Sequence, residues 1–347
     1  MKVKFWGTRG SICTPEPDFM KYGGNTSCVE VRLDNGTLLI LDAGTGIRKL
    51  GQNLLSDPTF NKSGYVLLSH QHWDHIQGFP FFTPAFLPNN HFTFLGQFKF
   101  DGRLEEALRG QMEYNYFPVR LDEMGSQLHF RELLEEEIEI AGAKIITRHL
   151  NHPQGVLGFR IEADGCVVTY CTDTEHYPDR LDTKVLELAQ NSDLFIYDSQ
   201  YTEEEFPKKI GWGHSTWNMG CRLAQEARVK NYCLFHHDPY HNDAFIDQIL
   251  TQAQRVFPGT IAATPEMELK LSRKNDFKAS WNKEIILPKK STAMPSFTIT
   301  QKNHILKIEL PHSKEEFVDL EFVSKVTENI TEMIEVMEIN FENLQEL

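Results

Sequence analysis

Short apolar or alternating runs, separated by polar turn residues, dominate the first 70 residues and predict β-strands there. Gly, Asn and Asp bound each run, and these residues commonly interrupt strands. Asn35-Gly36 lies between two of the runs and is a typical two-residue turn signal, so these two strands should form a hairpin. The predicted strands cover residues 3–7, 28–33, 37–42 and 65–69.

Further along the chain, amphipathic stretches with helical spacing alternate with short apolar runs. Strand–helix alternation combined with a hairpin predicts a layered α/β fold. Residues 80–135 break this rhythm with a stretch rich in Phe and Pro, and we interpret them as an insertion near the site that serves as a lid. Helices are predicted at 45–55, 103–112, 180–190, 216–228 and 243–256, and strands at 144–148, 156–162, 166–171, 194–198 and 231–235.

A shift in composition after residue 272 divides the sequence into three parts. We predict a main domain at 1–272, a polar linker at 273–296 and a small C-terminal α/β segment at 297–347. The last segment begins with two alternating runs that predict a hairpin, followed by an acidic helix and a final strand. It is short for an independent domain. Its pattern resembles the beginning of a STAS-type regulatory domain, which implies a truncated regulatory module.

The composition is ordinary for a globular protein, with 40% apolar and 24% charged residues among 347. Neither a membrane-length apolar run nor a secretory signal is visible, so we expect a cytoplasmic protein. The net charge is −14, and residues 311–347, with ten acids and two bases, contribute −8 of it. This balance argues against a large nucleic-acid partner, because phosphate binding needs clustered Lys and Arg. None of the six cysteines forms a C-x-x-C pair, so we interpret them as small buried side chains.

The densest group of ligand-type side chains follows the predicted strand at 65–69. His70 and His72 are two positions apart, so an extended backbone directs both to the same side. Asp74 and His75 fall on the next turn and can face a second cation. Imidazole and carboxylate donors together suit Zn, Mn or Fe. The spacing therefore predicts a metal centre directly after this strand.

A centre with two ions needs further ligands, and the chain offers them after other predicted strands. His152, Asp173 and His236 each stand shortly after an apolar run. Sites in α/β sheets lie at such carboxyl ends of strands, so we expect these side chains to join the centre. His149 is an alternative to His152, and His237 is an alternative to His236.

The motif His70-Gln71-His72-Trp73-Asp74-His75, with the later His152, Asp173 and His236, resembles the metallo-β-lactamase superfamily over roughly residues 1–270. The segments Phe5-Trp6-Gly7-Thr8-Arg9-Gly10-Ser11 and Gly213-His214-Ser215-Thr216 resemble its phosphodiesterase branch. That branch includes the tRNA 3′-processing endonucleases of ribonuclease Z type and the phosphoribosyl cyclic phosphodiesterases. The resemblance implies an αββα sandwich with two divalent ions. It assigns His70, His72 and His152 to one ion, Asp74, His75 and His236 to the other, and Asp173 to a bridge between them.

The resemblance also implies a hydrolase that attacks with a metal-bound hydroxide. We expect Zn as the metal, with Mn or Fe as alternatives. The expected substrate is a small anionic phosphodiester, either a cyclic nucleotide or a cyclic sugar phosphate. His214 is the expected proton donor to the leaving group, and its alternative role is to cap the following helix. Asp198 would orient His214, and Asp74 counts among the catalytic residues as well as the ligands.

Other functions stay open at this point. One is a ribonuclease Z-like RNA endonuclease, although the sequence shows no basic, Gly-rich arm that could grip RNA. Others are a β-lactamase or thioester hydrolase, and a metal-binding sensor with weak turnover, which the C-terminal segment motivates. The oligomeric state is also open, a homodimer being the commonest symmetric assembly.

Aromatic residues flank the metal motif and the Gly-His-Ser-Thr motif. They can stack on the base of a nucleotide substrate, or they can pack in the core, which is the more common role. The residues concerned are Trp73, Phe79, Phe81, Phe82, Tyr201, Trp212 and Trp217.

Overall fold

The computed structural model describes residues 1–99, 103–272, 278–281, 298–302 and 305–309. The chain divides into two compact units, Met1–Lys283 and Glu284–Leu347. Of the second unit, the described residues form an antiparallel hairpin of β16 (Thr298–Lys302) and β17 (Ile305–Glu309). The predicted acidic helix and final strand lie outside the described residues, and so does most of the predicted linker. The proposed division into domain, linker and regulatory segment therefore stays a prediction.

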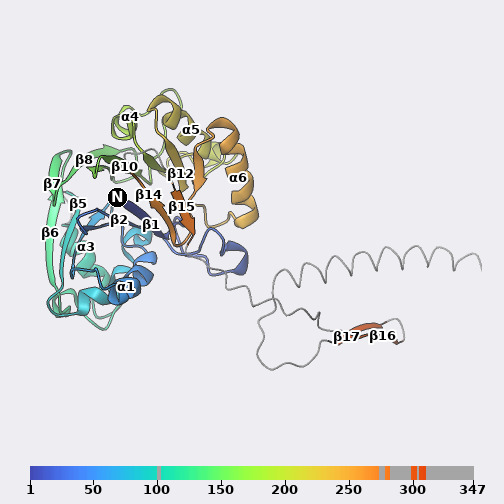
Figure 1. Cartoon of the computed structure of the whole chain (residues 1–347), viewed down its shortest axis with the longest axis horizontal. Coiled ribbons are helices and arrows are strands. Elements are labelled where there is room, and N and C mark those ends of the chain that lie inside the picture. The colour runs from blue at the N-terminus through green and yellow to red at the C-terminus, as the bar shows by residue number, and fades with distance from the viewer. Residues whose placement is uncertain (100–102, 273–277, 282–297, 303–304, 310–347) are drawn as a thin grey trace, which may run out of the picture. The chain divides into compact units, whose positions relative to one another are not determined.

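Two β-sheets form the centre of the first unit (Figure 1). The first sheet has the order β15 (Lys278–Trp281), β14 (Met267–Lys270), β1 (Lys2–Gly7), β2 (Cys28–Arg32), β3 (Leu38–Leu41), β4 (Ser63–Leu68), β5 (His91–Gln97) and β6 (Gln127–Leu133). The second has the order β13 (Thr260–Ala262), β12 (Asn231–Phe235), β11 (Leu194–Asp198), β10 (Cys166–Cys171), β9 (Val156–Ala163), β8 (Ala143–Leu150) and β7 (Glu137–Ile140).

Helices cover the outer face of each sheet (Figure 1). The first sheet carries α1 (Gly46–Ser56) and α3 (Leu104–Gln111), and the second carries α4 (Thr183–Ala189), α5 (Trp217–Glu226) and α6 (Asp243–Val256). The short helix α2 (Trp73–Ile76) stands directly after β4. No helix in the described part of the chain combines the length and apolarity needed to cross a bilayer.

Three apolar cores hold the four layers together, one between the sheets and one under each helical layer. In β3, Leu39 faces the core between the sheets and its neighbour Leu38 faces the core under α1 and α3. In β11, Ile196 faces the core between the sheets and its neighbour Phe195 faces the core under α4 to α6. Successive strand residues point to opposite faces, so strands covered on both faces read as continuous apolar runs. This arrangement confirms the predicted αββα sandwich.

The hairpin predicted at Asn35-Gly36 is present. β2 and β3 pair antiparallel, and Gly36 has a φ of 87°, which suits glycine at a tight turn. The interpretation of residues 80–135 as an inserted lid is wrong, because β5 and β6 extend the first sheet in parallel with β4. The pattern concealed β5 because its apolar residues face both layers, with Phe94 toward the helices and Leu95 toward the second sheet.

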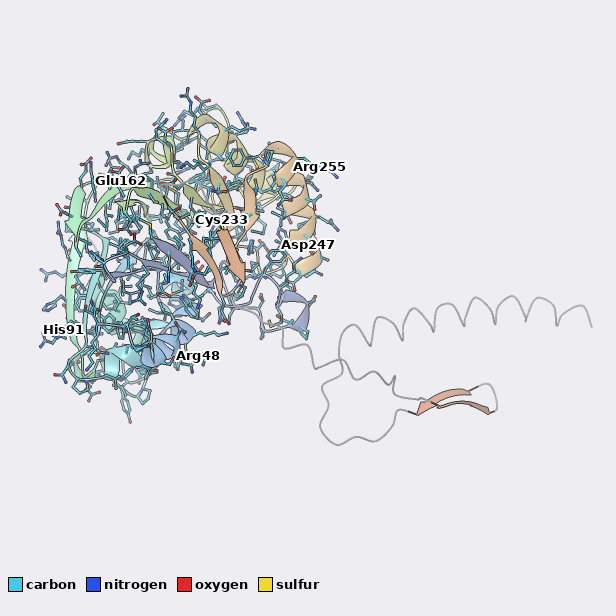
Figure 2. All side chains as sticks on the ribbon, in the orientation of Figure 1. Arg48, His91, Glu162, Cys233, Asp247 and Arg255 are labelled. Carbon is cyan, nitrogen blue, oxygen red and sulfur yellow. The ribbon has the colours of Figure 1, made fainter. Side chains whose placement is uncertain are left out.

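All six cysteines are free thiols, and five of them are buried, as predicted. Cys233, for example, lies in β12 and faces the core between the sheets (Figure 2). Cys13 is exposed, contrary to the prediction, because it lies in the loop after β1 rather than in a strand.

Candidate metal centre

The predicted ligands converge because each stands close behind the carboxyl end of a strand. His70 and His72 follow β4, and α2 then carries Asp74 and His75. The second sheet contributes one residue each after β8, β10 and β12. Within each of three groups, one ligand-type atom per residue lies within 4.8 Å of the others. His70, His72 and His152 form the first group, and Asp74, His75, Asp173 and His236 form the second. The third shares Asp173 and His236 with the second and adds Asp198 and His214.

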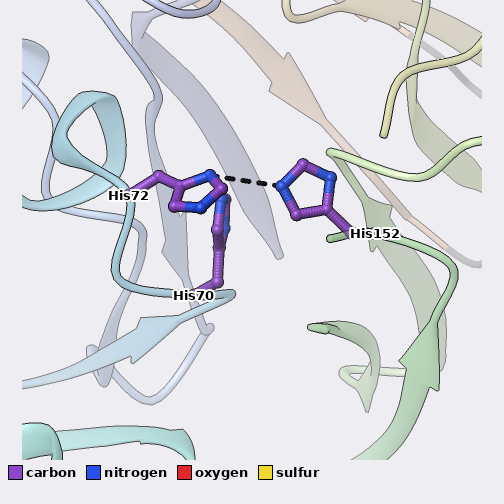
Figure 3. A group of neighbouring side chains, drawn as sticks. All are labelled: His70, His72 and His152. Carbon is purple, nitrogen blue, oxygen red and sulfur yellow. Dashed lines mark hydrogen bonds between the residues drawn. The ribbon is translucent and has the colours of Figure 1, made fainter. Parts of the chain in front are cut away.

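The first group consists of three imidazoles (Figure 3). His152 Nε2 lies 3.2 Å from His72 Nδ1, and the ring centre of His70 lies 4.4 Å from that of His72. His70 Nε2 is buried without a hydrogen-bond partner among the described residues. Burial lowers the pKa of His70 and of His152 and so favours the neutral imidazole, which is the form that ligates metals. The first group thus brings three imidazoles together, of which His70 and His152 are held in the form that binds metals.

The second group combines two imidazoles with two carboxylates. His75 Nε2 lies 3.2 Å from Asp74 Oδ2 and 3.1 Å from Asp173 Oδ1, yet it has no aligned hydrogen bond. His236 Nε2 lies 3.1 Å from Asp74 Oδ2 and 3.2 Å from Asp173 Oδ1. His236 Nε2 forms a hydrogen bond with Asp74 Oδ2, whereas His75 Nε2 lies between two carboxylates without one, as is expected where such atoms surround a cation. This donor set of imidazole and carboxylate fits a divalent transition metal.

Asp173 connects the first two groups. Its Oδ1 faces the second group, whereas its Oδ2 lies 3.7 Å from His70 Nε2 in the first. Asp173 and His236 have φ values of 51° and 61°, in the left-handed region that few residues other than glycine occupy. Such a conformation costs on the order of 1–3 kcal/mol and persists where the fold aims a functional side chain. The position of Asp173 suits the predicted bridging role.

The field of the carboxylates favours cations at this point. Burial alone would raise the pKa of Asp74 and of Asp173, but the nearby imidazoles hold both pKa values well below the usual range, so both side chains are charged. Burial alone would lower the pKa of His75, but Asp173 and Asp74 raise it. The same field that attracts a proton to His75 attracts a divalent ion in its place.

The imidazole nitrogens that face away from the centre are also held. An acceptor on each of them fixes the tautomer, so the opposite nitrogen keeps its lone pair for a metal. Four ligands are held in this way: His75 Nδ1 by Asp42 Oδ2 at 2.7 Å, His236 Nδ1 by Gln200 Oε1 at 2.9 Å, His152 Nδ1 by the Gly213 carbonyl oxygen at 2.9 Å, and His72 Nε2 by Gln154 Oε1 at 3.1 Å.

Asp42 is a functional residue that the sequence analysis did not identify. It is fully buried, and its carboxylate accepts hydrogen bonds from His75 Nδ1, Tyr170 Oη and the Ser69 backbone N–H, each at 2.7 Å. The sequence did contain a signal: Asp42 stands at the end of the apolar run of β3, where its carboxylate is expected to be buried. A buried charge needs partners, so such a carboxylate is a candidate for a functional role. Gln200, just after β11, carried no comparable signal.

Replacing Asp42 with Asn should weaken metal binding about 10- to 100-fold, as is typical for the loss of an acceptor behind a metal-bound histidine. The amide removes the negative charge that orients His75. It also places an N–H group where the carboxylate now accepts hydrogen bonds from other groups. Competition with a chromophoric zinc chelator measures the affinity, with the exposed Asp122→Asn as control. An unchanged zinc affinity in Asp42→Asn would contradict this role.

The predicted proton donor, His214, lies against the second group. Its Nδ1 donates to Asp198 Oδ2 at 2.8 Å, and its ring stacks on that of His236 with centres 4.9 Å apart. Burial alone would lower the pKa of His214, but Asp198 outweighs it and raises the pKa to about 9. The cap of α5 is Thr216, whose hydroxyl accepts from the Met219 backbone N–H, so His214 does not cap this helix.

The two alternative ligands lie outside all three groups. His237 Nε2 donates to the Ala263 carbonyl oxygen at 3.0 Å, and burial lowers the pKa of His237 to about 3. His149 Nδ1 lies 3.5 Å from Gln97 Nε2. The structure therefore brings His236 and His152, rather than their neighbours, to the centre.

The two segments that carry the likeness to phosphodiesterases border the ligand groups. A Cβ on Gly10 would lie 2.4 Å from His236 Nδ1, and a Cβ on Gly213 would lie 2.1 Å from His152 Nδ1. Only glycine leaves room for these rings. The Ser11 backbone N–H donates to Asp74 Oδ2 at 2.8 Å.

Comparisons with known proteins agree with this fold. The sequence model described as "Beta-lactamase superfamily domain" matches residues 37–237, more than half of the chain, and the protein belongs to this superfamily. A curated ribonuclease Z from Synechococcus sp. (strain CC9311) is 23% identical over 320 residues, which cover 76% of this chain and 96% of that protein.

Two solved structures share the fold. A diphosphatase of the PhnP family superposes with a TM-score of 0.58 at 19% identity and covers 78% of this chain and 98% of its own. The short form of human tRNase Z superposes with a TM-score of 0.57 at 18% identity, and the match covers 78% of this chain and 99% of the tRNase Z chain. The predicted superfamily and hydrolase class are thus confirmed, and the ligand groups mark the protein as a metal-binding hydrolase.

Proposed function

We propose that this protein is a dinuclear-metal phosphodiesterase that hydrolyses a small anionic phosphodiester, such as a cyclic nucleotide or a cyclic sugar phosphate. The observation that carries the proposal is the buried pair of His214 and Asp198 directly beside the second ligand group. Cleavage of a phosphodiester expels an alkoxide, a poor leaving group that benefits from a positioned acid. A histidine held by a carboxylate supplies such an acid.

The first ligand group would hold one ion and the second group the other, with Asp173 contacting both. Two divalent ions bound there would supply a nucleophile from water at neutral pH and neutralise charge on the phosphate. We propose zinc, because imidazole-rich sites that include carboxylates suit it, with manganese or iron as alternatives.

The protein's own residues orient the proton donor. Asp198 accepts from His214 Nδ1, so Nε2 is the nitrogen left to donate a proton to the leaving oxygen. Asp198 is itself fixed by the Ser215 backbone N–H at 3.1 Å. Stacking on His236 keeps the imidazole next to the ligand groups, where a leaving oxygen would emerge.

A second candidate is RNA endonuclease activity of the ribonuclease Z type, which the near full-length similarity to a ribonuclease Z favours. The net charge of −14 favours the small substrate instead, because gripping RNA requires many phosphate contacts from Lys and Arg.

The two candidates separate in a substrate panel. Zinc-loaded protein should hydrolyse bis(p-nitrophenyl) phosphate and adenosine 2′,3′-cyclic monophosphate, with little dependence of kcat/KM on salt between 50 and 200 mM, about the range over which RNA binding weakens steeply. Precursor tRNA and a chromogenic lactam complete the panel. Cleavage of precursor tRNA alone would support the second candidate, and turnover of the lactam alone would contradict both.

A further inference from the structure

Large apolar side chains are exposed next to residues of the metal centre. Trp73, between the ligands His72 and Asp74, is 79% exposed, and Trp212, directly before Gly213, is 59% exposed. Other aromatic residues near the motifs, such as Phe79 and Phe82, are buried in the core under α1. The aromatic residues that flank the motifs therefore divide into core residues and exposed residues, and Trp73, Trp212 and Phe81 are exposed.

Each of the two tryptophans is the chain neighbour of a residue that belongs to, or contacts, one pair of ligands. His72, which precedes Trp73, has its Nδ1 3.2 Å from His152 Nε2. His152 in turn donates from Nδ1 to the carbonyl oxygen of Gly213, which follows Trp212. Contacts through two of the ligand residues thus connect the residue before Trp73 to the residue after Trp212, so the segments that carry both tryptophans lie at the centre.

The turn that carries Trp212 is held in place. Glu175 accepts hydrogen bonds from the Gly211 and Gly213 backbone N–H groups at 2.7 and 3.0 Å, and the Trp212 backbone N–H donates to the Lys209 carbonyl oxygen at 3.0 Å. The Lys209 ammonium lies over the Trp212 ring, 4.0 Å from its centre. A cation over one face of an exposed indole, on a turn whose backbone is held, suits a ligand that combines a flat ring with negative charge.

We infer that Trp73 and Trp212 form a binding site for a flat ring, so that the substrate is a nucleotide-type phosphodiester rather than a simple sugar or glycerol phosphate. This inference rests on the proposed function, because the phosphodiester must occupy the metal centre for its ring to reach these tryptophans. Stacking recognises any base, since every base has a π-face, and exposed indoles supply the surface at little conformational cost.

A matched pair of substrates tests the inference: adenosine 2′,3′-cyclic monophosphate and glycerol 1,2-cyclic phosphate share the cyclic phosphate, and only the first has a ring. We expect the wild type to have the lower KM for the nucleotide. Trp73→Ala and Trp212→Ala should each raise that KM about 5- to 100-fold, the effect of losing one base stack, and leave the KM for the glycerol compound unchanged. Trp73→Phe should restore most of the affinity, and Leu55→Ala, an exposed apolar residue on α1, serves as control.

A second readout does not depend on turnover. Adenosine 5′-monophosphate should quench tryptophan fluorescence of the wild type and do so more weakly in either alanine variant, whereas ribose 5-phosphate should not quench it. Equal KM values for both cyclic phosphates in the wild type, or equal losses on both in the variants, would overturn the ring site. If neither cyclic phosphate is hydrolysed, the proposed function fails, and the quenching experiment alone then decides whether the ring site exists.

Discussion

Asp173→Asn should lower kcat/KM toward bis(p-nitrophenyl) phosphate by about 10³-fold or more. Asp173 faces both ligand groups, with Oδ1 near His75 and His236 and Oδ2 near His70. The amide removes the negative charge and directs either an N–H group or a neutral oxygen toward each ion. Metal ions contribute several kcal/mol of charge stabilisation in the transition state, and each 1.36 kcal/mol is about tenfold in rate.

The measurement combines steady-state kinetics with metal analysis of the same preparation. Asp179→Asn is the matched control, because Asp179 is exposed and pairs only with its neighbour Arg180 among the described contacts. An Asp173→Asn protein that keeps both ions and loses less than about tenfold in rate would show that this carboxylate does not bridge the metals.

His214→Ala should lower kcat about 10²- to 10⁴-fold on a substrate that expels an alkoxide, which is the usual contribution of a general acid. The loss should be much smaller with p-nitrophenolate as the leaving group, because that anion is stable without a proton. Zinc content should stay at the wild-type level, since His214 is in neither the first nor the second ligand group and its Nδ1 donates to Asp198. Comparing the two substrates in each variant therefore separates proton donation from metal binding.

His91→Ala provides a control for loss of an imidazole, because His91 is exposed at the first residue of β5 (Figure 2). β5 runs parallel to β4, and the ligands follow the last residue of β4, so His91 lies at the opposite end of the sheet. Asp198→Asn should reproduce the leaving-group dependence of His214→Ala with a smaller loss, since the imidazole remains but its orientation is weakened. Equal losses on both substrates in His214→Ala would exclude a role as proton donor.

The ligand positions could be predicted from the sequence because they depend on local rules. His70 and His72 are two positions apart after a strand, and His152, Asp173 and His236 each follow an apolar run. Strand ends bring such residues to a common edge, and the structure shows them there. The pairing of His214 with Asp198 was also predicted, and their hydrogen bond is present.

The residues that orient the ligands could not be predicted in the same way. Gln200 acts on His236 and Gln154 acts on His72 across 36 and 82 positions, and nothing local distinguishes them from other polar residues after strands. β6 was missed because it is an edge strand with alternating half-buried side chains and little apolar content. These features depend on tertiary contacts, which a local pattern does not encode.

The number of zinc ions held by each chain tests the central claim most directly. After removal of metals and reconstitution with excess zinc, native mass spectrometry should show two zinc ions per chain in the wild type. His72→Ala, in the first ligand group, and His236→Ala, in the second, should each retain one ion. A wild-type protein that binds no zinc, or that binds only one ion, would contradict a centre built from two joined ligand groups.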